Sequence, residues 1–169
     1  NNWSLSTNTG ENLLKPGKKP EENTQFLLFL AAVIKAVDEH QDLLRISVAT
    51  AGNDHRLGSS EAPPAIISMY LGDDLEAVVD AIINNEEYES HGRVLMKTGV
   101  ESMPDFKKDN SDRNRTSPFA FTGNKFEFRS LGSSISISCP NIMLNTIVAD
   151  VLSQFADTLE KAENFESSC

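Results

Sequence analysis

Residues 125–129 of the chain read Lys125-Phe126-Glu127-Phe128-Arg129, a strict alternation of charged and aromatic side chains. This alternation predicts a β-strand over roughly 125–130, because successive side chains of a strand point to opposite faces of a sheet. The two phenylalanines would face a core. The acid and the two bases would share the other face, about 6.5–7 Å apart.

A carboxylate between two cations suits a metal-bound polyphosphate. The acid would bind the cation, while the bases would hold phosphate groups or a substrate carboxylate. The same pattern also fits a solvated ladder of charges between neighbouring strands. The pattern alone leaves both interpretations open.

The local charge of this region differs from that of the whole chain. The chain has 15 basic and 25 acidic residues and a formal net charge of −10. In 112–129, four basic residues stand against two acidic ones, which gives +2 there and leaves −12 elsewhere. An acidic surface repels nucleic acid and anionic membranes, so we expect neither as a partner. A small cationic region suits a compact anion such as a nucleotide phosphate, although a chance run of solvated charge is the plain alternative.

The rest of the chain is predicted to mix helices and strands. Its 169 residues, 39% of them apolar, fit one domain with a real core. Apolar residues at helical spacing predict a helix after Pro20, a second over 73–83 and a third that begins at Pro140. Further strands are expected at 65–71 and 117–122, and 133–138 suits a strand or the approach to one. Residues 1–22 are expected to form a short extended piece followed by a loop, 47–64 a loop and 84–111 a surface excursion.

The remaining composition points to a reducing compartment. The chain has two cysteines, Cys139 and Cys169, far apart and without the spacing of a metal site or a disulfide framework. Nothing resembles a signal peptide or an apolar membrane span. We therefore expect a cytoplasmic protein. Because the sequence starts without Met on Asn1, we also expect it to be cut from a longer protein.

Two other segments could carry chemistry. Arg115 follows Arg113 by two positions and precedes two hydroxyl residues, although arginines here could equally pair with acidic neighbours. The long polar loop holds Arg56 and Glu61, which could close over a substrate. His55 beside them is more typical of a structural hydrogen-bonding residue.

These segments together resemble the type III glutamine synthetases. The resemblance covers nearly the whole chain, from Asn1 to roughly Phe165. It is carried by four runs in order: Asn53-Asp54-His55-Arg56-Leu57-Gly58, Glu61-Ala62-Pro63-Pro64, Asn114-Arg115-Thr116-Ser117-Pro118-Phe119 and Asn124-Lys125-Phe126-Glu127-Phe128-Arg129. The shorter opening run, Asn1-Asn2-Trp3-Ser4-Leu5-Ser6, also fits.

The resemblance implies an α+β fold, with an antiparallel sheet backed by helices, as the C-terminal part of a catalytic domain that carries a surface insertion near 84–111. It implies an ATP-dependent ligase that joins ammonium to glutamate through a γ-glutamyl phosphate, with Mg²⁺ or Mn²⁺ on the phosphates. The partners implied are glutamate, ammonium, ATP and further copies in a homo-oligomeric ring, with active sites between subunits.

The family's roles carry over onto individual positions. Arg129 resembles the arginine that contacts glutamate and the transferring phosphoryl group, and Arg56 resembles the glutamate-binding arginine. Glu61 resembles the catalytic flap carboxylate, which shields the intermediate from water and helps deprotonate ammonium. Glu127 resembles a metal ligand. The positions that match ATP contacts are Arg115, Lys125 and Ser4.

Several features depart from the family pattern. Many glutamine synthetases have arginine where Lys125 stands, and a further arginine of other classes has no counterpart here. The family's metal-binding histidine would lie immediately before Asn1, and its other metal glutamates further upstream. We therefore expect the chain by itself to be inactive. The alternative function is that of a catalytically inactive relative that senses nucleotide or glutamate, and a purely structural helical protein is a third.

Overall fold

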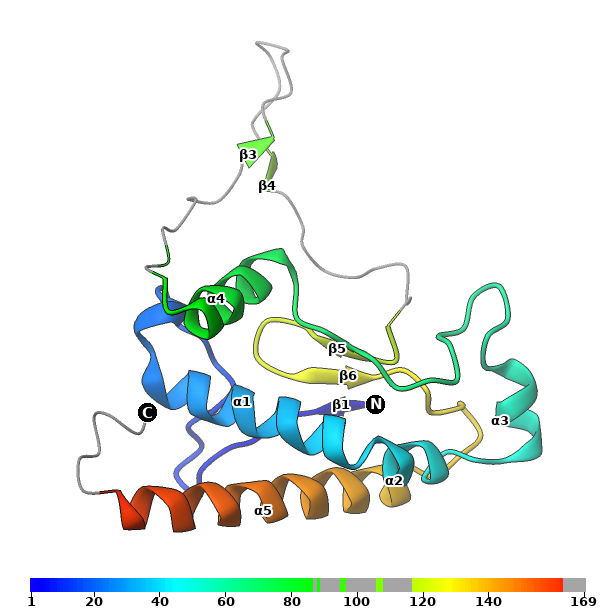
Figure 1. The fold of residues 1–169 in the computed structure, drawn as a ribbon. Helices are drawn as coiled ribbons and strands as arrows, with labels where there is room; N and C mark the ends of the chain where they lie inside the picture. The colour runs from blue at the N-terminus through cyan, green and yellow to red at the C-terminus, as the bar shows by residue number, and fades with distance from the viewer. Residues whose placement is uncertain (87, 89–94, 97–105, 108–116, 163–169) are drawn as a thin grey trace. The chain divides into compact units, whose positions relative to one another are not determined.

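The computed structural model describes residues 1–86, 88, 95–96, 106–107 and 117–162. The chain divides into two compact units. The first consists of Asn1–Tyr70 together with Asp112–Cys169, and the second of Leu71–Ser111. The first unit contains the sheet, the two longest helices and most of the residues considered for chemistry (Figure 1).

The first unit is built on a four-stranded sheet with the order β1-β6-β5-β2. Its strands are β1 (Asn2–Trp3), β2 (Met69–Tyr70), β5 (Phe119–Phe121) and β6 (Phe126–Phe128). β6 pairs antiparallel with both β1 and β5, whereas β2 pairs parallel with β5. The expected α+β fold with a sheet backed by helices is confirmed, but the sheet is mixed. A parallel pair needs a long crossover, and here the connection from β2 to β5 runs through the second unit.

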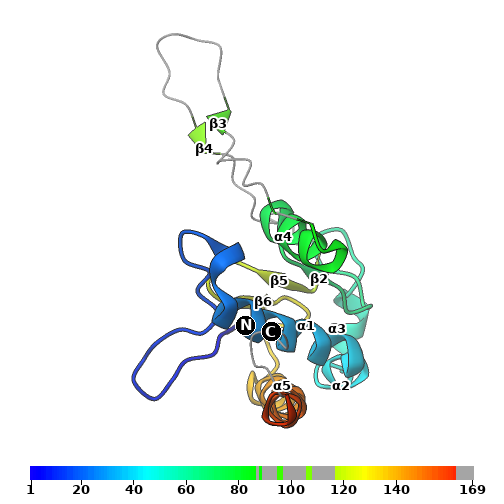
Figure 2. The same ribbon diagram turned by 60° about the vertical axis from the view of Figure 1, so that its left-hand side comes forward.

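Aromatic packing makes the core on one face of this sheet. Phe119, Phe126 and Phe128 are fully buried, and the rings of Phe119 and Phe126 stack at 4.6 Å. Helix α1 (Thr24–Glu39) reaches the sheet through Phe26, whose ring lies 6.0 Å from that of Phe121. Helix α5 (Ser138–Lys161) runs alongside α1, as both ribbon views show (Figures 1 and 2).

The two predicted helices of this unit form for the expected reasons. A 3-10 turn, η1 (Pro20–Glu22), precedes α1, and the side chain of Asn23 caps α1 by accepting from Phe26 N at 3.1 Å. Pro140 lies in the first turn of α5, where its missing N–H is not needed. The buried faces of the two helices consist of Phe26, Leu30, Ala32, Val33, Ala36 and Val37 in α1, and Pro140, Leu144, Ile147, Val148 and Val151 in α5.

The strand predicted over 65–71 was wrong in extent, and of the two alternatives for 133–138 the strand is not found. Over 65–71 only Met69–Tyr70 forms a strand, and Ile66 is 76% exposed rather than buried. The segment 133–138 forms no strand. There Ser136 Oγ accepts a hydrogen bond from Ser138 N at 3.3 Å, a local side-chain contact that competes with sheet pairing.

The segment predicted as a loop over 47–64 contains a short helix. α2 (Gln41–Ile46) precedes it, and α3 (Ala51–Arg56) lies inside it. α3 has no apolar period to reveal it, since Asn53 is its only buried residue. It is capped instead by Thr50, whose hydroxyl accepts from Asn53 N at 3.3 Å.

The second unit contains the predicted helix over 73–83, found as α4 (Asp73–Asn84). Asp73, Asp74 and Glu76 occupy its first turn, where negative charge is favoured. A small antiparallel pair follows, β3 (Leu95–Met96) with β4 (Phe106–Lys107). Most of the surface excursion predicted over 84–111 lies outside the described residues. No helix in the described part of the chain combines the length and apolarity needed to cross a membrane.

Candidate functional site

Strand β6 presents its charged residues on the face away from the core. Burial alternates from Lys125 to Arg129: both phenylalanines are fully buried, and the three charged residues are partly exposed. The predicted alternation is therefore confirmed. The alternation arises because successive side chains of β6 point to opposite faces of the sheet, and the phenylalanines occupy the face that meets the aromatic core.

Glu127 and Arg129 are brought together on this face. Arg129 Nε donates to Glu127 Oε2 at 3.2 Å, and the exposed fractions of the two side chains are 11% and 37%. An arginine this deeply buried needs a compensating acceptor, and Glu127 supplies one. The carboxylate keeps its second oxygen, Oε1, outside that hydrogen bond, so it can still offer one oxygen to a cation.

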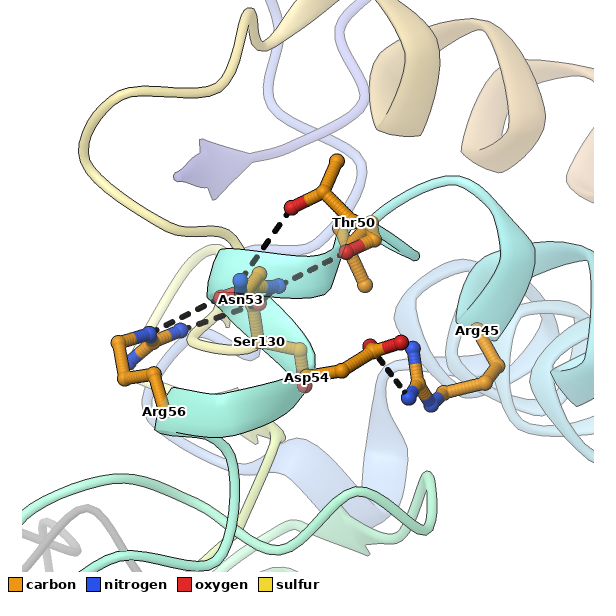
Figure 3. Close-up of polar contacts among 7 residues, drawn as sticks. Arg45, Thr50, Asn53, Asp54, Arg56 and Ser130 are labelled. Atoms are coloured by element: carbon orange, nitrogen blue, oxygen red, sulfur yellow. Dashed lines mark hydrogen bonds and ion pairs between the residues drawn. The ribbon is translucent and has the colours of Figure 1, made fainter.

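Helix α3 delivers Arg56 to the end of the same strand. Arg56 Nη2 lies 3.3 Å from the backbone oxygen of Arg129 and 3.1 Å from that of Ser130. Arg56 Nε donates to Asn53 Oδ1 at 3.0 Å (Figure 3). Two of the three guanidinium nitrogens are thus fixed by the protein. Among the described residues, Nη1 has no hydrogen bond, which leaves its edge for an anion.

On its other side, α3 is held by an ion pair. Arg45 Nη2 of α2 lies 2.7 Å from Asp54 Oδ1, and Figure 3 shows this pair pointing away from Arg56. The contact joins α2 to α3 without touching the Arg56 guanidinium. Asp54 therefore offers a place to disturb the helix separately from the candidate site.

The loop that follows α3 carries Glu61. Gly58 N donates to Pro63 O at 2.9 Å and closes the base of the loop, while Gly58 adopts φ +82, a conformation that favours glycine. Glu61 and His55 are both exposed. Among the described residues, no hydrogen bond or ion pair joins Glu61 to Arg56, Arg129 or Glu127.

Ser4 lies beside the turn between β5 and β6. Its hydroxyl donates to Asn124 O at 2.9 Å, and the amide of Asn12 donates to the same oxygen at 2.9 Å. Ser4 thus contacts Asn124, the sequence neighbour of half-exposed Lys125, although Ser4 and Asn124 lie 120 positions apart in the sequence. Arg115, the remaining predicted site residue, lies outside the described residues.

Sequence reasoning missed Asn53 and the backbone of Ser130. Asn53 is only 5% exposed, and its Nδ2 donates to Val48 O at 2.9 Å and to Ser130 O at 2.8 Å. The signal in the sequence was an asparagine three positions before an arginine, which would share one side of a helix with it. That spacing is common in sequences, and it indicates a contact here only because both residues lie on the short helix α3.

The described residues contain no cluster of three or more histidine, cysteine, aspartate or glutamate side chains that could hold a metal ion. Among these residues, Glu127 therefore belongs to no cluster of that size. Its carboxylate oxygen is the donor type that Mg²⁺ and Mn²⁺ prefer.

The fold and this site define an α+β chain that gathers two arginines and a carboxylate at the end of the inner strand β6. No family model matches the chain. It is 60% identical over 152 residues to the type-3 glutamine synthetase of Dictyostelium discoideum, which covers 90% of this chain and 21% of that protein.

Two bacterial relatives agree. The chain is 48% identical over 164 residues to a glutamine synthetase of Bacteroides fragilis, covering 95% of this chain and 22% of the relative. It is 58% identical over 136 residues to one of Butyrivibrio fibrisolvens, covering 80% and 19%. The resemblance to type III glutamine synthetases is thus confirmed. The chain spans about a fifth of the length of the curated relatives it matches.

Proposed function

We propose that this chain is the C-terminal part of a glutamine synthetase catalytic domain, carrying an insertion near 84–111. Within a longer cytoplasmic enzyme it would ligate ammonium to glutamate at the expense of ATP. The observation that carries the proposal is the meeting of Arg56, from α3, with the strand end that bears Arg129 and Glu127. The identities of 48–60% to relatives named as glutamine synthetases support the choice of this reaction.

The reaction has two steps. An oxygen of the glutamate side-chain carboxylate attacks the terminal phosphorus of ATP, the bond to the bridging oxygen breaks, and ADP leaves. Ammonia then attacks the acyl carbon of the γ-glutamyl phosphate, and phosphate departs with the oxygen that came from glutamate. The first step places charge on phosphoryl oxygens, and the second places it on the acyl oxygen and then on the departing phosphate, so positioning and charge neutralisation are the main tasks of the protein.

The arginines fit these tasks. Arg129 would contact the transferring phosphoryl group, because its guanidinium is held in place by Glu127 and offers a planar fork of donors that matches phosphoryl oxygens. Arg56 would bind the glutamate carboxylate through Nη1, while its other nitrogens stay fixed on the protein. Arg56 would thus bind the substrate in the ground state, while Arg129 would stabilise the charge of the transition state.

The other predicted residues complete the proposed site. Glu61 would shield the acyl phosphate from water and take a proton from ammonium, a task that suits an exposed residue on a loop. Lys125, Arg115 and Ser4 would lie along the ATP. Glu127 would hold Mg²⁺ or Mn²⁺ through its carboxylate, and the bound ion would neutralise phosphate charge. The other metal ligands would come from upstream in the longer protein, and neighbouring subunits of a ring would complete each site.

The test uses the full-length protein that contains this chain. Phosphate release from ATP should require glutamate, and added ammonium should give glutamine in equal amount. A protein that binds ATP or glutamate but releases no phosphate would instead be a sensing relative. The chain by itself should bind neither substrate productively and should make no glutamine.

A further inference from the structure

The buried amide of Asn53 uses all of its hydrogen-bonding atoms. Nδ2 donates to Val48 O at 2.9 Å and Ser130 O at 2.8 Å, and Oδ1 accepts from Arg56 Nε at 3.0 Å. A buried amide with both donors and its acceptor satisfied has one favoured orientation. The Asn53 side chain therefore has little freedom to rotate, and it restricts the Arg56 guanidinium that donates to it.

Asn53 and Arg56 also share a partner. Arg56 Nη2 donates to Ser130 O, the same oxygen that accepts from Asn53 Nδ2 (Figure 3). The three residues thus form a closed ring of hydrogen bonds that links one turn of α3 to the chain after β6. A ring of this kind fixes both the position of the guanidinium and the rotation of its plane.

The space beside Asn53 is filled. A Cβ atom added at Gly132 would lie 3.0 Å from Asn53 Oδ1 and 3.5 Å from its Cγ. The 3.0 Å distance is shorter than an ordinary van der Waals contact, so a side chain at position 132 would push the Asn53 amide out of its position. Glycine at position 132 therefore leaves room for the Asn53 amide, and a substitution at Gly132 would displace it.

We propose that Asn53 is a positioning residue that aims Arg56 at the glutamate carboxylate, an inference that rests on the proposed function. An asparagine suits this place better than an aspartate for two reasons. A carboxylate would face the carbonyl oxygens of Val48 and Ser130 without a proton to share, and it would partly neutralise Arg56. The neutral amide leaves the full charge of Arg56 for the substrate.

Asn53→Asp in the full-length protein is the direct test, because the two side chains have the same shape. The KM for glutamate should rise about tenfold, with the KM for ATP unchanged, since only the group that binds glutamate is displaced. The value of kcat should fall by much less. A merely structural role would lower the melting temperature and leave the ratio of the two KM values unaltered.

A matched control lies on the same helix. Asp54→Ala removes the ion pair with Arg45 and loosens α3 from the opposite side. It should lower the melting temperature slightly and leave the KM for glutamate as it was. If Asp54→Ala raised that KM as much as Asn53→Asp, any disturbance of α3 would suffice and the proposal would be overturned.

A double variant separates the two residues. If Asn53 acts through Arg56, adding Asn53→Asp to Arg56→Ala should raise the KM for glutamate no further, whereas independent roles would multiply the two effects. Gly132→Ala is the second perturbation, should the Asn53 variants fail to fold. It removes no hydrogen-bonding group, yet it should raise the same KM by pressing on the amide.

The outcomes also distinguish this inference from the proposed function. An increase with Arg56→Ala but none with Asn53→Asp and Gly132→Ala would overturn the positioning role and leave the ligase intact. If the wild-type protein made no glutamine, glutamate affinity would be measured by calorimetry instead. A tenfold weaker affinity in Asn53→Asp would then support the positioning role, and an unchanged affinity would overturn it.

Discussion

Arg56 Nη2 lies 3.3 Å from the backbone oxygen of Arg129, so two arginines 73 positions apart meet at one end of the sheet. The contact uses the carbonyl of Arg129 and leaves its guanidinium to pair with Glu127. Arg56 donates to the side chain of Asn53 and Arg129 to that of Glu127, so these two hydrogen bonds use different acceptor side chains. This arrangement is what a site for two anionic substrates requires.

Arg129→Ala in the full-length protein should lower kcat by orders of magnitude, because a charge contact made in the transition state is lost. The steady-state rate of glutamine formation at saturating substrates measures this decrease in kcat. Arg129→Lys is the matched control: it keeps the charge but loses the fixed fork of donors, so it should recover only part of the rate. Full activity in Arg129→Ala would remove the assigned role.

Glu127→Gln should raise the Mg²⁺ or Mn²⁺ concentration needed for half-maximal activity by about tenfold or more, since a charged oxygen ligand becomes neutral. Glutamine keeps an oxygen that can accept from Arg129 Nε, so the melting temperature should change little. A metal titration at fixed ATP measures the effect. An unaltered metal requirement would mean that Glu127 serves only as the partner of Arg129.

Glu61→Gln should change the outcome of the reaction more than the stability of the protein, because Glu61 is exposed. Glutamine formation should fall while phosphate release falls less, as water reaches the acyl phosphate. The ratio of phosphate to glutamine, measured on the same samples, reports this directly. A ratio that stays at one would argue against a shielding role.

Ser130→Ala should leave the melting temperature unchanged or raise it. Ser130 is fully buried, and among the described residues its hydroxyl has no hydrogen-bond partner. Removing an unsatisfied buried hydroxyl relieves a desolvation cost, while the backbone oxygen used by Asn53 and Arg56 remains. A drop of several degrees would reveal a partner for the hydroxyl.

Phe126→Ala should destabilise the protein by about 3–5 kcal/mol, because a fully buried ring in contact with two other rings is replaced by a cavity. Denaturant unfolding measures the change. Ile66→Ala is the comparison, since that side chain is 76% exposed and its removal should cost about 0.5 kcal/mol or less. Equal costs at the two positions would contradict the described core.

The sequence predicted the parts of the fold that depend on local pattern. The alternation around Glu127 indicated both the strand and its buried face, and the spacing of apolar residues after Pro20 and Pro140 indicated the two long helices. Alternation misled at 133–138, where Ser136 satisfies a neighbouring backbone N–H and no strand forms. Periodicity cannot distinguish a strand from a turn whose hydrogen bonds are local.

The candidate site was only partly within reach of the sequence. Arg56, Glu127 and Arg129 were candidates from the sequence pattern, and resemblance gave them roles. Helix α3 was not predicted, because a six-residue helix with one buried residue has no apolar stripe. The role of Asn53 depends on the carbonyls of Val48 and Ser130, which only the folded chain brings together. Arg115 stays a prediction, since it lies outside the described residues.

Isotope transfer tests the central proposal most directly. The full-length protein would be supplied with glutamate carrying ¹⁸O in its side-chain carboxylate, together with ATP and ammonium, and the released phosphate analysed by mass spectrometry. If the reaction passes through a γ-glutamyl phosphate, each phosphate carries a single ¹⁸O atom. Phosphate without the label would mean that water attacks ATP directly, and would contradict the assignment of this chain to a glutamine-forming ligase.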